Sequence, residues 1–287
     1  MRYIRFQKIA RTVESLCIAA AYELPEDTLN AIEKAAKKES NPKAVKILQQ
    51  LIENAHIAKT EKIPLCQDTG LAVVFIEEGT DVAVSPSSEY SGSTITDAVN
   101  AGVKAGYENS YLRKSVVAEP LNERKNTATN TPAVIHHSVV PGDKLKINLL
   151  TKGGGCENKS AFRMFKPTAD LKLIIDWVVE VVKSAGSDAC PPFIVGIGIG
   201  GNFELSCLLS KKALLRNLDT HNSDEFYAKL EADLLTKINK LGLGPQGLGG
   251  DTTALACLVE TAPCHIASLP VAVNIECHSH RHASAVI

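Results

Sequence analysis

The segment IPLCQDTGLAVVF, residues 63–75, marks the change of pattern on which the fold prediction rests. Pro64 and the run Asp68-Thr69-Gly70 are typical of a turn. The β-branched apolar residues that follow are typical of a buried strand. A turn accounts for the proline and the glycine. It leaves open why a thiol, an amide, a carboxylate and a hydroxyl stand in a row at residues 66–69.

Before this segment, the first 60 residues have the periodicity of helices. An amphipathic stretch covers about 7–23, and Pro25 suits the first turn of a second helix. Asn41 as cap and Pro42 as first helical residue predict the start of a third helix. Its apolar positions fall on one face: Val45, Leu48, Leu51 and Ile52.

After the segment, strand and helix patterns follow each other along the chain. Strands are predicted at 71–79, 133–140, 144–152, 193–201, 253–260 and 265–275, and helices at 93–109, 167–186 and 223–242, the last between Ser223 and Gly242. Pro141-Gly142-Asp143 joins two of the strands in a hairpin-like pair. The fold class is therefore α+β (mixed α/β). We expect a single domain, 1–287, with a helical part of about 1–60 and a mixed part of about 61–287.

Composition excludes several classes of protein. The 31 Lys and Arg nearly balance the 32 Asp and Glu, so neither nucleic acid nor an anionic membrane surface is an expected partner. The N-terminal apolar positions are interrupted by polar residues, which argues against a signal peptide. No apolar run approaches the ~18 residues of a membrane helix. We expect a cytoplasmic protein.

The eight cysteines are expected to be reduced, because they are too sparse for a disulfide scaffold. None forms a C-x-x-C pair, so a metal or cluster site would have to be assembled from distant segments. Cys17, Cys207 and Cys257 lie in apolar periodic stretches, and we expect them to fill the core.

Four glycine-rich loops adjoin reactive residues, at 66–70, 152–160, 189–204 and 242–253. Such loops suit a pocket for a small anion or a cofactor, although each one alone could be an ordinary tight connection. Gly196, Gly198 and Gly201 also match the dinucleotide fingerprint, with Asp219 in place of the ribose-binding acid. An NAD-linked dehydrogenase is therefore a weaker alternative, since no second strand presents Asp219.

Several motifs together resemble a known family. PLCQDTG, KGGGCENKS, ACPP with GIGIGGNFE, LSKKALLR, GPQGLGGDTTAL and HIASLPVAVNIECH are similar to the alpha segment of the class I iron-sulfur fumarate hydratase and L-tartrate dehydratase family. The resemblance runs from about residue 10 to the end of the chain. It implies a [4Fe-4S] cluster bound by Cys66, Cys190 and Cys277, with one iron open to substrate, which makes the enzyme oxygen-sensitive.

The resemblance also implies the residues that meet a small dicarboxylate substrate. Gln67 and the catalytic Asp68 would bind or orient it, Arg113 would supply a cation, and the amides of Gly154 and Gly155 would approach a carboxylate. Lys152 and Arg281 are weaker candidates for cations. Cys156 is expected to line the pocket and not to act as a fourth ligand.

Substrate and partner follow from the same resemblance. ENKS and GLGGDTT are similar to fumarases, which favours hydration of fumarate to L-malate in the tricarboxylic acid cycle, whereas Cys156 also suits L-tartrate dehydratase. The family's base belongs to a further domain, so we expect a beta subunit and a hetero-oligomer. A non-catalytic scaffold is the remaining alternative. The tail CHSHRH departs from the family pattern, and His278, His280 and His282 could share one strand face.

Overall fold

The computed structural model describes residues 1–85 and 94–287. Within them the chain forms two compact units. Unit 1 contains Met1–Pro25, Ile57–Gly153 and Arg281–Ile287, and unit 2 contains Glu26–His56 and Gly154–His280. Helices and strands mix in both units, which confirms the predicted α+β class. The single domain stays a prediction.

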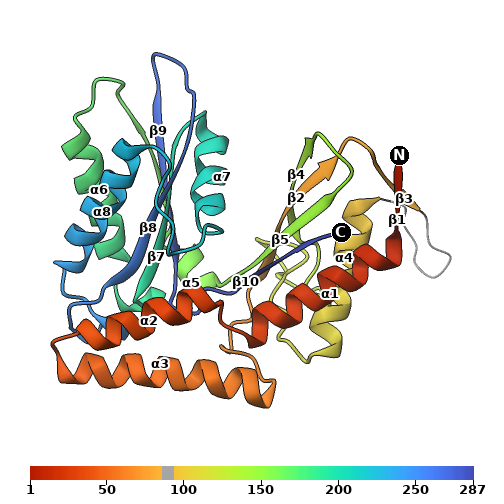
Figure 1. Cartoon of the computed structure of the whole chain (residues 1–287), viewed down its shortest axis with the longest axis horizontal. Helices are drawn as coiled ribbons and strands as arrows, with labels where there is room; N and C mark the ends of the chain where they lie inside the picture. The colour runs from red at the N-terminus through yellow and green to blue at the C-terminus, as the bar shows by residue number, and fades with distance from the viewer. Residues whose placement is uncertain (86–93) are drawn as a thin grey trace. The chain divides into compact units, whose positions relative to one another are not determined.

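Unit 1 is built on a four-stranded sheet with the order β10-β5-β2-β4. The helices α1 and α4 pack against each other, and α1 packs on β5 and β10 (Figure 1). The strands are β1 Arg2–Arg5, β2 Leu71–Gly79, β3 Val82–Ser85, β4 Val134–Val140, β5 Leu145–Lys152 and β10 His282–Val286, and the helices are α1 Phe6–Tyr22 and α4 Ile95–Asn109.

The pairing of β4 and β5 differs from the predicted hairpin. Both strands pair with β2, β4 in parallel and β5 in antiparallel orientation, so β2 lies between them. The turn at 141–143 crosses the end of β2, where Asp81 N donates to Gly142 O at 2.9 Å. A side chain at Gly79 would place its Cβ 2.3 Å from Gly142 O. The strand therefore needs glycine where the turn passes over it.

Helix α4 contacts α1 through small residues. A Cβ at Gly102 would lie 2.4 Å from Ala10 O, so the two backbones approach more closely than larger residues allow. The helix begins with a capping box formed by Thr94 and Asp97. Ser93, with which the predicted helix begins, lies outside the described residues.

Unit 2 has three layers around a sheet with the order β6-β9-β7-β8. Helices α6 and α8 cover one face of the sheet and α7 covers the other (Figure 1). The strands are β6 Ala161–Phe165, β7 Phe193–Gly200, β8 Ala254–Ala262 and β9 Leu269–Glu276, and the helices are α2 Glu26–Lys38, α5 Gly154–Glu157, α6 Leu171–Ala185, α7 Phe203–Ala213 and α8 Glu225–Asn239. Helix α3, Pro42–Glu61, begins in unit 2, and its last residues belong to unit 1.

Two helix caps test the sequence predictions directly. Asn41 Oδ1 accepts the Lys43 N–H at 3.0 Å, so Asn41 caps α3 as predicted. In α8 the cap is Asp224, whose Oδ1 accepts the Phe226 N–H at 2.9 Å, one residue after the predicted Ser223. None of the described helices combines the length and apolar composition that crossing a membrane requires.

The glycines of GIGIGG are explained by packing. A Cβ at Gly198 would lie 2.0 Å from Ser206 O, and one at Gly196 would lie 2.1 Å from Ser210 O, so both glycines let α7 lie directly on β7. Asp219 forms an exposed ion pair with Lys34 at 2.7 Å. The dinucleotide-like spacing therefore has a structural reason within unit 2.

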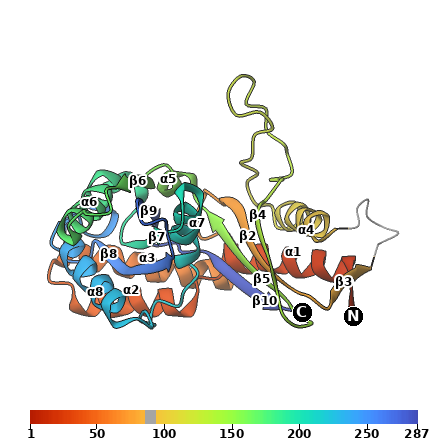
Figure 2. The ribbon, with the colours of Figure 1, turned by 90° about the horizontal axis from the view of Figure 1, so that it is seen from above.

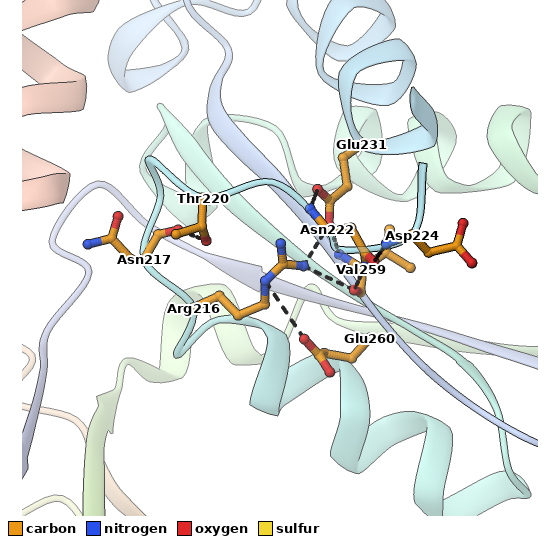
Figure 3. A network of polar contacts seen from close by, with 8 residues as sticks. All are labelled: Arg216, Asn217, Thr220, Asn222, Asp224, Glu231, Val259 and Glu260. Atoms are coloured by element: carbon orange, nitrogen blue, oxygen red, sulfur yellow. Dashed lines mark hydrogen bonds and ion pairs between the residues drawn. The ribbon is translucent and has the colours of Figure 1, made fainter. Parts of the chain in front are cut away.

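A buried ionic network fastens the segment between α7 and α8 (Figure 3). Arg216 Nη1 donates to Glu231 Oε1 at 2.7 Å and to Val259 O at 3.1 Å. Glu231 also accepts the N–H groups of Val259 at 2.8 Å and Asn222 at 3.2 Å. Because Glu231 is 5% exposed, these donors compensate the burial of its charge.

Candidate active site

In unit 1 the CQDTG loop directly precedes β2. Asp68 Oδ1 accepts the Gly70 N–H at 3.1 Å, which fixes the carboxylate within the turn. Cys66 is partly buried, and its Sγ lies 3.4 Å from Gln67 Oε1 on the exposed Gln67 side chain. Gly70 has φ +78°, and a Cβ there would lie 2.8 Å from the Thr151 carbonyl carbon. The turn therefore depends on glycine at this position.

Two buried side chains form hydrogen bonds with the backbone at the end of this loop. The Tyr107 hydroxyl donates to Thr69 O at 2.8 Å and can also reach Gly70 O at 3.0 Å. Asn130 Nδ2 donates to Gly70 O at 3.1 Å, and Asn130 Oδ1 accepts the Ser115 N–H at 2.7 Å. Burial raises the pKa of Tyr107, so the phenol stays a neutral donor.

Three cationic residues lie beside this loop in unit 1. Arg113 has an exposed side chain, and its carbonyl accepts the Thr69 hydroxyl at 2.5 Å. Lys152 is 2% exposed and lies opposite Leu71 in the β2–β5 pair. Arg281 is 1% exposed and donates through Nη1 to Asp68 O. Its buried Nε has no hydrogen-bond partner among the described residues, so it retains a donor for a ligand.

In unit 2, Cys190 and Cys277 lie on neighbouring segments. Cys190 has φ +55° directly before Pro191 and Pro192, and its carbonyl lies 3.1 Å from His278 Nδ1. Gln246 Nε2 donates to Pro191 O at 3.1 Å and lies 3.1 Å from His278 Nδ1. His278 follows Cys277 directly, so these contacts tie the ACPP loop to the residue beside the second thiol.

Cys277 also belongs to a cluster of possible metal ligands. Cys156 and Cys277 offer sulfur atoms and Glu276 offers an oxygen atom, all within 4.8 Å of one another. Glu276 Oε1 is 3.6 Å from Cys156 Sγ and 3.8 Å from Cys277 Sγ. Of the described residues, only these three form such a group. Cys156 is 3% exposed and Glu276 is fully buried.

Gly154 and Gly155 are exposed and open the single helical turn of α5 in unit 2. Gly154 O accepts the Asn158 N–H at 3.1 Å. A Cβ at Gly155 would lie 3.4 Å from Asp188 O, so a side chain there would be in tight contact. Their role in binding a carboxylate stays a prediction.

The remaining cysteines follow the core prediction only in part. Cys17 is fully buried and Cys257 is 4% exposed, and burial raises the pKa of Cys17 to about 12 and raises that of Cys257 as well. Such thiols are inert. Cys207 is only partly buried, because its helix α7 leaves one side accessible, so its assignment to the core was wrong.

The histidine tail does not share one strand face. Strand β9 ends at Glu276 and β10 begins at His282, and the intervening residues form no strand. His278 and His280 therefore lie in the connection, where His280 is fully buried. The tail first meets β5 at Arg281, whose carbonyl accepts the Thr151 N–H at 3.0 Å, and strand pairing begins at His282, opposite Leu150.

Sequence reasoning missed three residues of these sites. Tyr107 and Asn130 lie far along the chain from the CQDTG loop that they hold, and no motif marks them. Glu276 directly precedes Cys277 in NIECH, and this position beside a proposed ligand could have marked it as a residue of the site. Strand alternation then places Glu276 on the same face as Asn274, opposite the core residues Val273 and Ile275.

The residues present fit an iron-sulfur cluster in their chemistry. Cys66, Cys190 and Cys277 are all partly accessible thiols in loops, in contrast to the buried Cys17 and Cys257. Iron-sulfur clusters are held by thiolates, and ligands are commonly presented from loops on a rigid scaffold.

The chain resembles known proteins along almost all of its length. The family model described as fumarate hydratase (Fumerase) matches residues 10–286. A Methanocaldococcus jannaschii protein provisionally named L(+)-tartrate dehydratase subunit alpha is 42% identical over 280 residues, which cover 96% of each chain. Proteins from Escherichia coli and Shigella sonnei named L(+)-tartrate dehydratase subunit alpha are each 27% identical over 281 residues, which cover 98% of this chain and 91% of theirs. The chain therefore belongs to the fumarate hydratase (Fumerase) family and is a hydro-lyase chain.

Proposed function

We propose that the chain is the alpha subunit of a [4Fe-4S]-dependent L(+)-tartrate dehydratase. The observation that carries this proposal is the 42% identity, over 96% of both chains, with a protein provisionally named as that subunit. Cys156 after three glycines agrees with it, because it departs from the fumarase-like pattern. Fumarate hydratase, which the ENKS and GLGGDTT motifs favoured, becomes the second candidate and is supported by the description of the family.

Cys66, Cys190 and Cys277 are the proposed cluster ligands. They are the three partly accessible cysteines that the family motifs mark. Three thiolates leave one of four irons open, and a cluster of this kind would supply a Lewis acid for the hydroxyl group that leaves the substrate. The partial exposure of all three thiols supports this assignment, since buried thiols resist deprotonation.

The protein's own residues would bind and orient the dicarboxylate. Gln67 and Asp68 present an amide and a carboxylate from a turn, and the Asp68 carboxylate is suited to hold or accept a proton at its oxygen atoms. Arg113 is exposed, and Arg281 retains a buried donor at Nε. Two arginines suit two carboxylate groups. Gly154 and Gly155 would bring backbone N–H groups near a carboxylate.

A beta subunit is the proposed partner. The relatives are named as alpha subunits, which supports a second subunit for this chain as well. The reduced state expected for eight free cysteines agrees with a cytoplasmic enzyme that is sensitive to oxygen.

Anaerobic kinetics would test the substrate and the partner together. The chain is reconstituted with iron and sulfide, mixed with an equimolar beta-type subunit, and assayed with L(+)-tartrate and with L-malate. We expect kcat/KM to favour tartrate by at least about 10²-fold, since a site that hydrogen-bonds a second hydroxyl discriminates strongly against its absence. Without the beta subunit, loss of a general base should lower the rate by about 10²- to 10⁴-fold. A preference for malate would support the fumarate hydratase instead.

A further inference from the structure

The cluster formed by Cys156, Glu276 and Cys277 has the composition of a site for a single metal ion. Two sulfur atoms and one carboxylate oxygen lie within 4.8 Å of one another in unit 2. Thiolates select thiophilic ions such as zinc, and a carboxylate is also a common zinc ligand. Of the described residues, no other group of histidine, cysteine and acidic side chains is this close.

The distances agree with ligands that share one ion. Tetrahedral zinc with bonds of about 2.3 Å to sulfur and about 2.0 Å to oxygen places its sulfur and oxygen ligands about 3.5 Å apart. Glu276 Oε1 lies 3.6 Å from Cys156 Sγ and 3.8 Å from Cys277 Sγ. Only small side-chain movements would close these gaps.

The surrounding contacts hold the residues next to the three ligands. Glu157, next to Cys156, forms an ion pair with Lys211 and accepts Asn274 Nδ2 at 3.4 Å. Ser160 Oγ accepts the Ile275 N–H at 3.2 Å, which ties the residues after α5 to β9. Outer contacts of this kind orient metal ligands and raise affinity.

A buried acceptor on β9 gives a second, independent indication of a ligand. Glu276 is fully buried, and its Oε1 accepts the Cys277 N–H at 3.3 Å, which keeps this oxygen beside the two sulfur atoms. Asn274 lies two residues earlier on the same face of β9 and is 5% exposed. Its Oδ1 has no hydrogen-bond partner among the described residues, so it offers a buried oxygen acceptor on this face.

We infer that Cys156, Cys277 and Glu276 bind one thiophilic divalent cation, such as Zn²⁺, in the chain that lacks a cluster. Binding releases the protons of the two thiols, and water fills the remaining position. Because Cys277 is also a proposed cluster ligand, the ion and the cluster exclude each other. Zinc at this site therefore blocks cluster assembly. The metal site itself does not depend on the proposed function, whereas this competition does.

Zinc binding to the cluster-free chain tests the inference. The protein is stripped with a chelator under reducing anaerobic conditions and titrated with Zn²⁺ alone, and X-ray absorption reports the ligands. We expect one ion per chain with two sulfur ligands. Cys156→Ser and Glu276→Gln should each weaken binding by at least about 100-fold. Circular dichroism confirms that both variants fold, and Cys257→Ser and Cys66→Ser are the matched controls that should keep the ion.

The outcomes separate this inference from the proposed function. Undiminished zinc affinity in the Cys156→Ser variant, or loss of zinc in Cys66→Ser, would overturn the site. A full cluster in Cys66→Ser would instead contradict the proposed cluster ligands and leave the zinc site standing. In reconstitution with iron and sulfide, zinc should block assembly in the unmodified chain but not in Cys156→Ser. Equal inhibition of both proteins would overturn the competition.

Discussion

Glu231 and Glu276 are both buried in unit 2, and their surroundings differ in chemistry. Glu231 accepts hydrogen bonds from the Arg216 guanidinium and two backbone N–H groups, at 2.7 to 3.2 Å (Figure 3). Glu276 Oε1 accepts the Cys277 N–H at 3.3 Å and lies against the sulfur atoms of Cys156 and Cys277. A guanidinium beside a buried carboxylate makes it a structural anchor, whereas thiols beside it make it a candidate member of a ligand set. Burial alone therefore does not identify a functional carboxylate.

The largest effect is expected at the three proposed cluster ligands, one of which, Cys277, lies beside Glu276. Cys66→Ser, Cys190→Ser and Cys277→Ser should each prevent assembly of a complete cluster and lower activity by at least about 10³-fold, because the Lewis acid supplies several kcal/mol. Iron and sulfide content after anaerobic reconstitution measures the loss. Cys257→Ser, which replaces a buried thiol of unit 2, should keep the cluster. A variant that retains four irons and its absorption would remove that cysteine from the ligand set.

The two glutamates themselves should respond to the same substitution with losses of stability of different size. Glu231→Gln leaves Arg216 with only its longer ion pair to Glu260 and should lower the free energy of unfolding by about 3 kcal/mol. Glu276→Gln keeps the size of the side chain and an oxygen that can accept the Cys277 N–H, so it should lower the stability of the metal-free chain by less, about 1 kcal/mol. Urea denaturation measures both, with Glu260→Gln as control, since its pair with Arg216 is longer, at 3.8 Å, and partly exposed. Equal destabilisation by the two substitutions would mean that Glu276 is also an anchor.

Local sequence patterns were enough to find most elements of the fold. Strand β2 at Leu71–Gly79 and the cap of α3 at Asn41 follow from alternation and turn chemistry, both of which act between near neighbours. These local patterns did not predict the order of the strands in the sheet. β4 and β5 pair with β2 and not with each other, because register depends on which apolar faces meet in the folded sheet.

The same division applies to the candidate site. The family motifs marked Cys66, Cys190 and Cys277, and a proline follows Cys190 directly, whereas no glycine or proline adjoins Cys277. Tyr107 and Asn130 could not be found, because Tyr107 reads as an apolar position of a helix and Asn130 as an ordinary loop residue. Their hydrogen bonds to the CQDTG loop join residues at least 37 positions apart. Such long-range polar contacts leave no local periodicity.

A smaller effect on stability is expected at Tyr107, the neutral donor to the CQDTG loop. Tyr107→Phe removes a hydroxyl that serves two buried carbonyl groups and should lower the free energy of unfolding by about 1–3 kcal/mol. Tyr22→Phe is the matched control in unit 1, since its hydroxyl donates to the single carbonyl of Ser110 at 3.0 Å and is only part-buried. Thermal unfolding compares them. A larger loss in Tyr22→Phe would contradict the anchoring role of Tyr107.

The smallest effect is expected at Asp219, the residue that the dinucleotide fingerprint would need. Its contact with Lys34 is a surface ion pair whose side chains are 51% and 61% exposed, so Asp219→Asn should lower the free energy of unfolding by less than about 1 kcal/mol. We also expect no effect on NAD binding. Gly196 and Gly198 are required for the packing of α7 on β7, and this packing explains the glycines without a dinucleotide. Calorimetric titration of the unmodified chain with NAD should show no heat of binding. Saturable binding that Asp219→Asn weakens would restore the dehydrogenase interpretation and give the glycines a second role.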